Sequence, residues 1–263
     1  MASRPWRRIA ITGASSGLGR ALAEACAGPG VTLHLAGRDP GRLAASAAAC
    51  RARGASVMEQ ALDVRDAAAC GAWIAAMDGL DLLIANAGIS GGTGGQSEPM
   101  DQVQAIFATN VQGVLNTALP AMQKMAAQPP DSRGLRGQVG VVASVAAFVA
   151  APGAAAYCAS KAAVQNWAEA TDATERARGL RLHAICPGYI RTPMTAVNAF
   201  PMPFMLEPEE AARRTLDGLA AGRTRIAYPW PTYAISRIAG ALPLGLRAWL
   251  ASRVPAKPVA EKV

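Results

Sequence analysis

A tyrosine and a lysine four residues apart, Tyr157 and Lys161, are the side chains whose types and spacing most directly suggest chemistry. Residues four apart on a helix lie on the same face, so the phenol and the ammonium can meet at one reacting atom. We expect the ammonium to lower the phenol pKa from its ordinary value of about 10, which would make Tyr157 a general acid or base. Ser144, which ends an apolar run upstream, adds a hydroxyl to this pair.

Short apolar runs alternate with alanine-rich stretches along the chain, a pattern typical of βαβ units around a parallel sheet. We predict strands at residues 8–12, 31–36, 56–62, 80–85, 138–144, 181–186 and 224–228. The predicted helices are 17–27, 42–53, 67–77, 100–127, 157–178 and 208–221. These elements indicate an α/β fold, a doubly wound parallel sheet with helices on both faces.

The domain organisation follows from the absence of any internal repeat or linker. We expect residues 1–263 to form a single domain with a binding and catalytic core at 1–228. Residues 229–263 read as a basic and apolar tail with two short helices that break at Pro243.

A glycine-rich segment joins the first predicted strand to the first predicted helix. It reads Thr12-Gly13-Ala14-Ser15-Ser16-Gly17-Leu18-Gly19. Glycines allow the backbone to turn sharply and to approach a pyrophosphate, and a helix N-terminus favours the anion. The segment therefore predicts a nucleotide site, formed by Gly13, Ser15, Ser16, Gly17, Leu18 and Gly19.

Further motifs follow in order along the chain. They are Asp63 in Leu-Asp-Val, Asn86-Ala-Gly88, Asn110, Ser144, Tyr157 with Lys161, and Pro187-Gly188-Tyr-Ile190-Arg-Thr192. With this ordered set, residues 8–195 resemble the short-chain dehydrogenase/reductase family in its compact single-domain branch. One departure is Ala85, where the family usually has an asparagine before Asn-Ala-Gly.

The resemblance implies a Rossmann-like fold and hydride transfer between a nicotinamide and a carbonyl or secondary alcohol. It implies that Tyr157 exchanges a proton with the substrate oxygen, while Lys161 lowers its pKa and hydrogen-bonds the nicotinamide ribose. Ser144 would orient the substrate oxygen, and Asn110 would hold a water that links Lys161 to solvent. It also implies that Asp63 contacts the adenine. The other cofactor contacts that it implies are Val64, Asn86, Ala87, Gly88, Tyr157, Lys161, Pro187, Gly188, Ile190 and Thr192.

The end of the second predicted strand bears on which cofactor is used. A carboxylate there binds the adenosine ribose 2′-hydroxyl, whereas an arginine accommodates a 2′-phosphate. Gly37 stands where the acid would be, and the guanidinium of the following Arg38 suits a phosphate. NADP(H) is therefore favoured over NAD(H), with Ser15 as a further phosphate contact, although Asp39 would compensate part of the charge of Arg38.

The formal net charge of +8 lies in the last third of the chain. Residues 1–175 hold 13 basic and 13 acidic side chains, and residues 176–263 hold 13 and 5. Such asymmetry indicates an anionic neighbour (a lipid surface, an acidic protein or an anionic substrate) or a solvated rim. Nucleic acid is not expected, because no binding motif accompanies the charge.

The tail mixes Arg237, Arg247 and Arg253 with Trp, Ile and Leu, which suits an anionic membrane surface, a cover over the active site or a dimer contact. No apolar run reaches the ~18 residues that span a bilayer. We expect a cytoplasmic protein, at most peripheral at the inner face of a membrane, that forms a homodimer or homotetramer.

The uncharged segment Met194–Leu206 is rich in Met, Phe and Pro and indicates an apolar substrate pocket. Our leading hypothesis is an NADP(H)-dependent oxidoreductase acting on a small lipophilic carbonyl or alcohol. One alternative is a 3-oxoacyl-carrier-protein reductase, and another is a catalytically silent protein that senses the cofactor or associates with a membrane. No metal is expected, because the two histidines and five cysteines lack ligand spacing.

Overall fold

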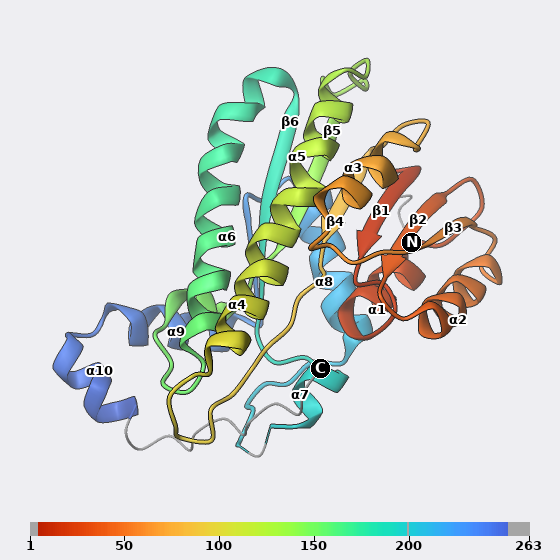
Figure 1. The fold of residues 1–263 in the computed structure, drawn as a ribbon. Helices are drawn as coiled ribbons and strands as arrows, with labels where there is room; N and C mark the ends of the chain where they lie inside the picture. Colours follow the sequence, from red (N-terminus) through yellow and green to blue (C-terminus); the bar gives the residue numbers. More distant parts are fainter. Residues whose placement is uncertain (1–4, 199, 252–263) are drawn as a thin grey trace.

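The computed structural model describes residues 5–198 and 200–251 and contains a seven-stranded sheet in which every paired strand is parallel (Figure 1). The strands are β1 (Arg8–Thr12), β2 (Thr32–Gly37), β3 (Ser56–Ala61), β4 (Leu82–Ala85), β5 (Gly137–Val142), β6 (Leu180–Pro187) and β7 (Arg225–Tyr228). Their order in the sheet is β3-β2-β1-β4-β5-β6-β7. Successive strands are therefore added on one side of β1 up to β3 and on its other side from β4 onward, and this switch between β1 and β4 creates the crevice where such folds bind ligands.

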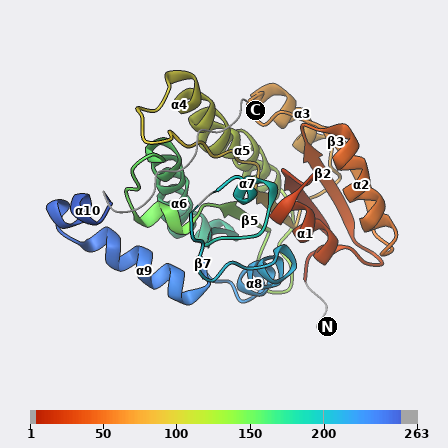
Figure 2. The same cartoon turned by 90° about the horizontal axis from the view of Figure 1, so that it is seen from below.

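Helices cover both faces of the sheet (Figure 2), which confirms the predicted doubly wound, Rossmann-like fold. One face carries α1 (Gly17–Cys26), α2 (Pro40–Arg51) and α8 (Pro208–Ala220). The other carries α3 (Ala67–Ala75), α4 (Met100–Phe107), α5 (Gly113–Ala126) and α6 (Ala155–Glu175). Two apolar cores, one on each side of the sheet, hold these layers together.

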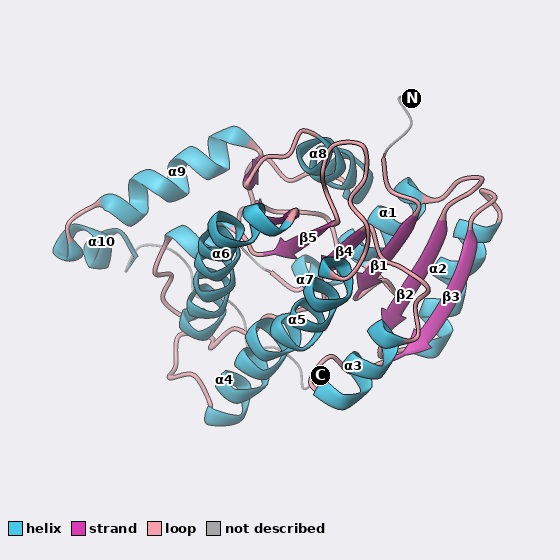
Figure 3. Ribbon diagram, turned by 90° about the horizontal axis from the view of Figure 1, so that it is seen from above, coloured by secondary structure: helices cyan, strands magenta, loops and turns pink. Residues whose placement is uncertain are grey.

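Smaller elements lie around the ends of the strands. A short helix, α7 (Pro193–Ala196), follows β6, and 3₁₀ turns occupy Val145–Phe148 and Arg176–Arg178. The tail forms α9 (Trp230–Ala241) and α10 (Leu244–Ala251), separated at Pro243 as predicted. Figure 3 shows that α9 and α10 extend away from the sheet at one end of the molecule.

Two of the differences between the predicted and the observed helices concern the helices predicted at 100–127 and 42–53. The helix expected at 100–127 is interrupted by a turn of π-helix at Ala108–Gln112. Helix α2 begins at Pro40 rather than at residue 42, because the Asp39 carboxylate accepts a hydrogen bond from the Arg42 amide (2.9 Å) and Pro40 fits the first helical position. Both differences fall beside the predicted site.

A buried carboxylate, Asp172, ties α6 to β6 and to the start of β7. It is 1% exposed and accepts hydrogen bonds from Arg181 Nε (2.9 Å), the Leu182 amide (2.9 Å), Arg176 Nη2 (2.6 Å) and Thr224 Oγ1 (2.9 Å). Burial by itself raises the pKa of this carboxyl, but these four donors outweigh it and lower the pKa to about 2.

We expect Asp172→Asn to lower the free energy of unfolding at neutral pH by about 3 kcal/mol, since the buried side chain loses its charge pairs with Arg181 and Arg176 and one of its acceptor oxygens becomes an NH₂ group that faces their donors. The depressed pKa alone corresponds to about 2 kcal/mol of stability, which is complete above about pH 4 and lost as the pH falls towards about 2. Urea unfolding of both proteins over this pH range measures the effect. The control is Asp217→Asn, which removes an exposed pair with Arg213 and should change stability by less than ~1 kcal/mol. An equal loss in both variants would contradict this account of Asp172.

Candidate active site

A cavity of about 510 Å³ opens at the carboxyl ends of the strands. All the predicted site residues line it except Gly19 and Asn110. Those that the structure brings together are Gly13, Ser15, Ser16, Gly17, Leu18, Arg38, Asp63, Val64, Asn86, Ala87, Gly88, Ser144, Tyr157, Lys161, Pro187, Gly188, Ile190 and Thr192.

The glycine-rich loop between β1 and α1 forms a cradle that fits phosphate groups. Gly13 and Gly17 have φ angles of +64° and +53°, which disfavour residues with a Cβ. A Cβ on Gly19 would lie 2.2 Å from the Gly13 carbonyl oxygen, so Gly19 permits close packing of the loop rather than lining the cavity. Ser16, the residue before α1, makes no side-chain cap hydrogen bond, so the first-turn amides of this helix suit an anionic ligand.

Two residues fix the loop after β4 to the end of β1. The Asn86 side-chain nitrogen donates to the carbonyls of Thr12 (3.0 Å) and Gly13 (3.2 Å), and Thr12 Oγ1 accepts from the Asn86 and Ala87 amides. Asn86 thus holds the glycine loop in place, and Thr12 likewise holds the loop after β4 against the end of β1.

The end of β2 presents Arg38 to the cavity. Asp39 does not neutralise it, because the Asp39 carboxylate binds Arg42 Nε at 2.8 Å and caps α2. Within the described part of the chain the Arg38 guanidinium makes no hydrogen bond, although its charge helps to lower the pKa of Asp63 after the larger effect of Arg65. A Cβ on Gly37 would come within 3.2 Å of Ser15 Oγ, so a carboxylate side chain at this position would crowd Ser15.

Asp63 follows β3 at the rim of the cavity and is held by its neighbour Arg65. The Arg65 guanidinium donates to the Asp63 carboxylate at 2.5 and 2.9 Å, and the Arg65 amide donates at 3.0 Å. These bonds, led by that from the guanidinium, lower the pKa of Asp63. The carboxylate is therefore fixed as an acceptor beside the backbone of Val64.

Ser144, Tyr157 and Lys161 meet at the inner end of the cavity. Ser144 ends the segment after β5, and its hydroxyl hydrogen-bonds the Tyr157 side chain. Lys161 is 4% exposed, and its ammonium donates to the Val142 carbonyl at 2.8 Å and lies 5.8 Å from the centre of the Tyr157 ring.

The prediction that the pKa of Tyr157 lies below its ordinary value is wrong for the protein by itself. Burial raises the pKa of Tyr157 to about 12, and the hydrogen bond with Ser144 offsets only part of the shift. Burial also lowers the pKa of Lys161 to about 8. The phenol is therefore protonated at neutral pH, which suits a proton donor.

Asn110 lies in the π-helical turn and is fully buried. Its side-chain oxygen accepts from the Ile89 amide (2.8 Å), and its nitrogen donates to the Ile89 carbonyl (2.9 Å) and to Ser160 Oγ (3.1 Å). These bonds connect the loop after β4 to α6. A water-holding role for Asn110 stays a prediction.

Other residues that line the cavity were not predicted. They are Arg42, Leu62, Ile89, Ser90, Thr109, Val142, Ala143 and Pro193. Most are sequence neighbours of predicted residues and carry no signal of their own. Arg42 is the exception, because a second arginine so soon after Arg38 adds a phosphate-binding side chain that is visible in the sequence.

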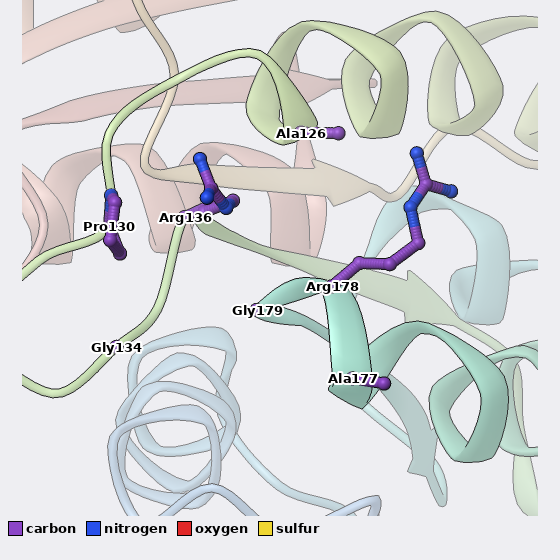
Figure 4. A pocket seen from close by; sticks show the side chains of 7 residues that line it. All are labelled: Ala126, Pro130, Gly134, Arg136, Ala177, Arg178 and Gly179. Carbon is purple, nitrogen blue, oxygen red and sulfur yellow. The ribbon is translucent and has the colours of Figure 1, made fainter.

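A second cavity, of about 400 Å³, lies far from these groups, at the amino ends of β5 and β6 (Figure 4). Its lining includes Arg136 and Arg178. Arg136 donates to the Gln128 carbonyl and Arg178 pairs with Glu175. Both guanidinium groups thus have partners within the protein, and this cavity contains none of the predicted site residues.

Residues 5–198 and 200–251 show neither a metal-binding cluster nor a membrane-spanning helix. No group of three or more potential metal ligands occurs there, and all five cysteines are buried without a disulfide. Nor does any helix in these ranges have the length and apolar character to cross a bilayer.

Comparison with known proteins decides the family. The family model described as short chain dehydrogenase matches residues 7–200. The chain belongs to the short-chain dehydrogenases/reductases. This membership makes it an oxidoreductase that acts on CH–OH groups and binds a nicotinamide cofactor.

Individual relatives of this short-chain dehydrogenase/reductase agree with the assignment. An uncharacterized oxidoreductase of Myxococcus xanthus is 37% identical over 92% of the chain and 95% of that protein. A Streptomyces virginiae protein named as a polyketide synthase ketoacyl reductase is 33% identical over 70% of each chain. The crystal structure of a short-chain dehydrogenase/reductase from Burkholderia phymatum in complex with NAD has a TM-score of 0.80 at 26% identity, covering 99% of this chain and 100% of that one.

Proposed function

We propose that this short-chain dehydrogenase/reductase uses NADP(H) to reduce an apolar carbonyl or to oxidise the corresponding alcohol. The observation that carries the cofactor preference is Arg38, whose guanidinium faces the cavity while Asp39 is bound to Arg42. A guanidinium can pair with a 2′-phosphate through two hydrogen bonds. With Gly37 in place of an acid, nothing at this position favours the 2′-hydroxyl of NAD(H).

Binding of the cofactor rests on the two ends of the cavity. The glycine loop would hold the pyrophosphate, and Arg38 with Ser15 would hold the 2′-phosphate. Asp63 and Val64 would contact the adenine, while Pro187, Gly188, Ile190 and Thr192 would face the nicotinamide. The bound nicotinamide supplies or accepts the hydride.

The chain's own part in the reaction is proton transfer. Tyr157 is protonated at neutral pH and can donate its phenolic proton to the substrate oxygen as negative charge develops there. Ser144 hydrogen-bonds the same phenol and orients the substrate oxygen towards it. The buried ammonium of Lys161 stabilises the tyrosinate that forms, because opposite charges interact more strongly away from water.

The apolar character of the substrate follows from the segment after β6. Met194 and Val197 line the cavity and remain 40% and 61% exposed, without a charged residue between Met194 and Leu206. Methionine adapts to apolar ligands of different shapes, so Met194 with Val197 supports an apolar substrate at this end of the cavity.

Cofactor titration followed by a substrate panel tests the proposal. NADPH and NADH are titrated by fluorescence, and NADPH oxidation is then followed with a steroid ketone, a quinone, a 3-oxoacyl thioester and a free sugar. We expect tighter binding of NADPH and turnover on an apolar ketone. Tight binding without turnover on any carbonyl would favour the silent, cofactor-sensing alternative, and absence of binding would overturn the proposal.

A 3-oxoacyl-carrier-protein reductase is the second candidate. It is supported by the ketoacyl reductase among the relatives and by the basic excess of residues 176–263, which could bind an acidic carrier protein. Much faster turnover on a carrier-bound 3-oxoacyl group than on the free steroid ketone would favour it.

We also propose that the tail contacts anionic lipid. Ile235 and Ile238 lie on one face of α9 and are 57% and 65% exposed, and no acidic residue occurs between Asp217 and Glu261. Deletion is a poor test, because Arg225 of β7 hydrogen-bonds Tyr233 of α9.

The double variant Ile235→Asp/Ile238→Asp should therefore lose ~10-fold or more in binding to vesicles of phosphatidylcholine and phosphatidylglycerol, because it removes apolar area and adds negative charge. Co-sedimentation measures this loss. Met58→Asp, at an exposed position of the edge strand β3, is the matched control and should bind as wild type. If the wild type does not sediment with anionic vesicles, the membrane contact is refuted.

A further inference from the structure

Helix α6 carries Tyr157 in its first turn, and that turn is not capped from within its own sequence. The residue before the helix is Ala154, which has no side-chain acceptor. Backbone N–H groups of a first helical turn need partners outside the helix. Glu98 supplies one from a distant segment, since its Oε2 accepts from the Ala156 amide at 2.9 Å.

Glu98 lies near the end of the loop that runs from β4 to α4 and passes the N-terminal end of α6 (Figure 1). Near its start, Ile89 is held by two hydrogen bonds with the Asn110 side chain. Ile89 and Ser90 line the cavity. Near its far end, Gln102 Nε2 donates to Glu98 Oε1 at 3.4 Å. The loop is thus fixed at one end beside the cavity and at the other to the helix of Tyr157.

We propose that Glu98 is a positioning residue for Tyr157. Its carboxylate accepts a hydrogen bond from the residue directly before Tyr157, and a negative charge at a helix N-terminus is favourable. Loss of this bond lets the first turn of α6 fray, and with it the direction of the phenol relative to Ser144. Glu98 also joins that turn to the loop that lines the cavity. The inference rests on Tyr157 as the proton donor.

Asp66 provides a matched control. Its Oδ1 accepts from the Ala69 amide at 2.9 Å and caps α3, so it makes the same kind of bond at a helix that carries no predicted site residue. Glu98→Ala and Asp66→Ala each remove one carboxylate cap. A purely structural role predicts similar consequences for the two variants.

Steady-state turnover of NADPH with the best apolar ketone of the panel tests the inference. We expect Glu98→Ala to lower kcat by ~10- to 100-fold, as for a reacting group displaced by about 1 Å, with KM within ~3-fold of wild type. Glu98→Gln should recover most of kcat, because its amide oxygen still accepts from Ala156. Asp66→Ala should retain kcat. Equal losses in Glu98→Ala and Asp66→Ala, failure of the glutamine to rescue, or a loss that appears in KM alone would overturn the inference.

Two measurements keep the test independent of folding defects and of the substrate. Should Glu98→Ala not fold, Glu98→Asp takes its place. The aspartate retains the charge but is one methylene too short to reach the Ala156 amide, so an unchanged kcat in this variant would refute the role. Hydrogen exchange of the amides at residues 155–158 needs no substrate, and Glu98→Ala should speed it while Asp66→Ala does not. Unaltered exchange would also refute the role. Persistent turnover in Tyr157→Phe, by contrast, would reject the proposed function itself.

Discussion

Replacing Tyr157 by phenylalanine should lower kcat by ~10³-fold or more and leave the dissociation constant for NADPH unchanged within ~2-fold. The substitution removes the phenolic hydroxyl while the ring still fills its site. A positioned general acid contributes ~10²- to 10⁴-fold to a rate, and Tyr157 is the protonated phenol that hydrogen-bonds Ser144 at the inner end of the cavity. Single-turnover oxidation of NADPH, together with fluorescence titration of the cofactor, separates the two effects.

The matched control for this experiment is Tyr189→Phe. Tyr189 is half-buried, and burial likewise raises its pKa. Its ring packs against that of Phe200, with 6.2 Å between the ring centres. It does not line the cavity, so its hydroxyl should be dispensable for turnover. If Tyr157→Phe keeps wild-type turnover, another group supplies the proton.

Replacing Arg38 by alanine should raise the dissociation constant for NADPH by ~10- to 100-fold and that for NADH by less than ~2-fold. Hydrogen bonds between a guanidinium and a phosphate are worth about 1.5–3 kcal/mol, and NADH has no phosphate at this place. Parallel titrations with both cofactors measure the difference.

Arg20→Ala controls for the loss of one positive charge. Arg20 lies on α1, pairs with Glu24 at 2.7 Å and does not line the cavity. We expect it to leave both dissociation constants unchanged. Equal weakening of NADPH and NADH by Arg38→Ala would mean that Arg38 does not contact the 2′-phosphate.

The sequence predicted the sheet, its helices and most of the cavity because these depend on local patterns. A glycine loop between a strand and a helix, or Ser144 at the end of an apolar run, is positioned by elements whose periodicity is visible in the sequence. Parallel strands bring their carboxyl ends to one edge, so residues that follow different strands converge without further information.

What the sequence did not predict depends on contacts between distant segments. Glu98 and Ala156 meet only because the loop before α4 passes the end of α6. The π-helical turn at Asn110 likewise shows no signature in a helical pattern. The direction of the Tyr157 pKa was wrong, since the spacing to Lys161 suggests a charge effect but does not reveal how completely the phenol is removed from water.

The contacts around the glycine loop make the affinity for the cofactor depend on how completely the chain is folded. The Asn86 side chain after β4 holds Gly13, and the Thr192 methyl after β6 lies 3.0 Å from where a Cβ of Gly17 would be. The phosphate cradle is therefore complete only when segments from both halves of the chain have assembled. The apparent affinity for the cofactor therefore falls in proportion to the fraction of fully assembled molecules, and saturating NADPH should raise the folded population of a variant damaged away from the cavity, such as Asp172→Asn.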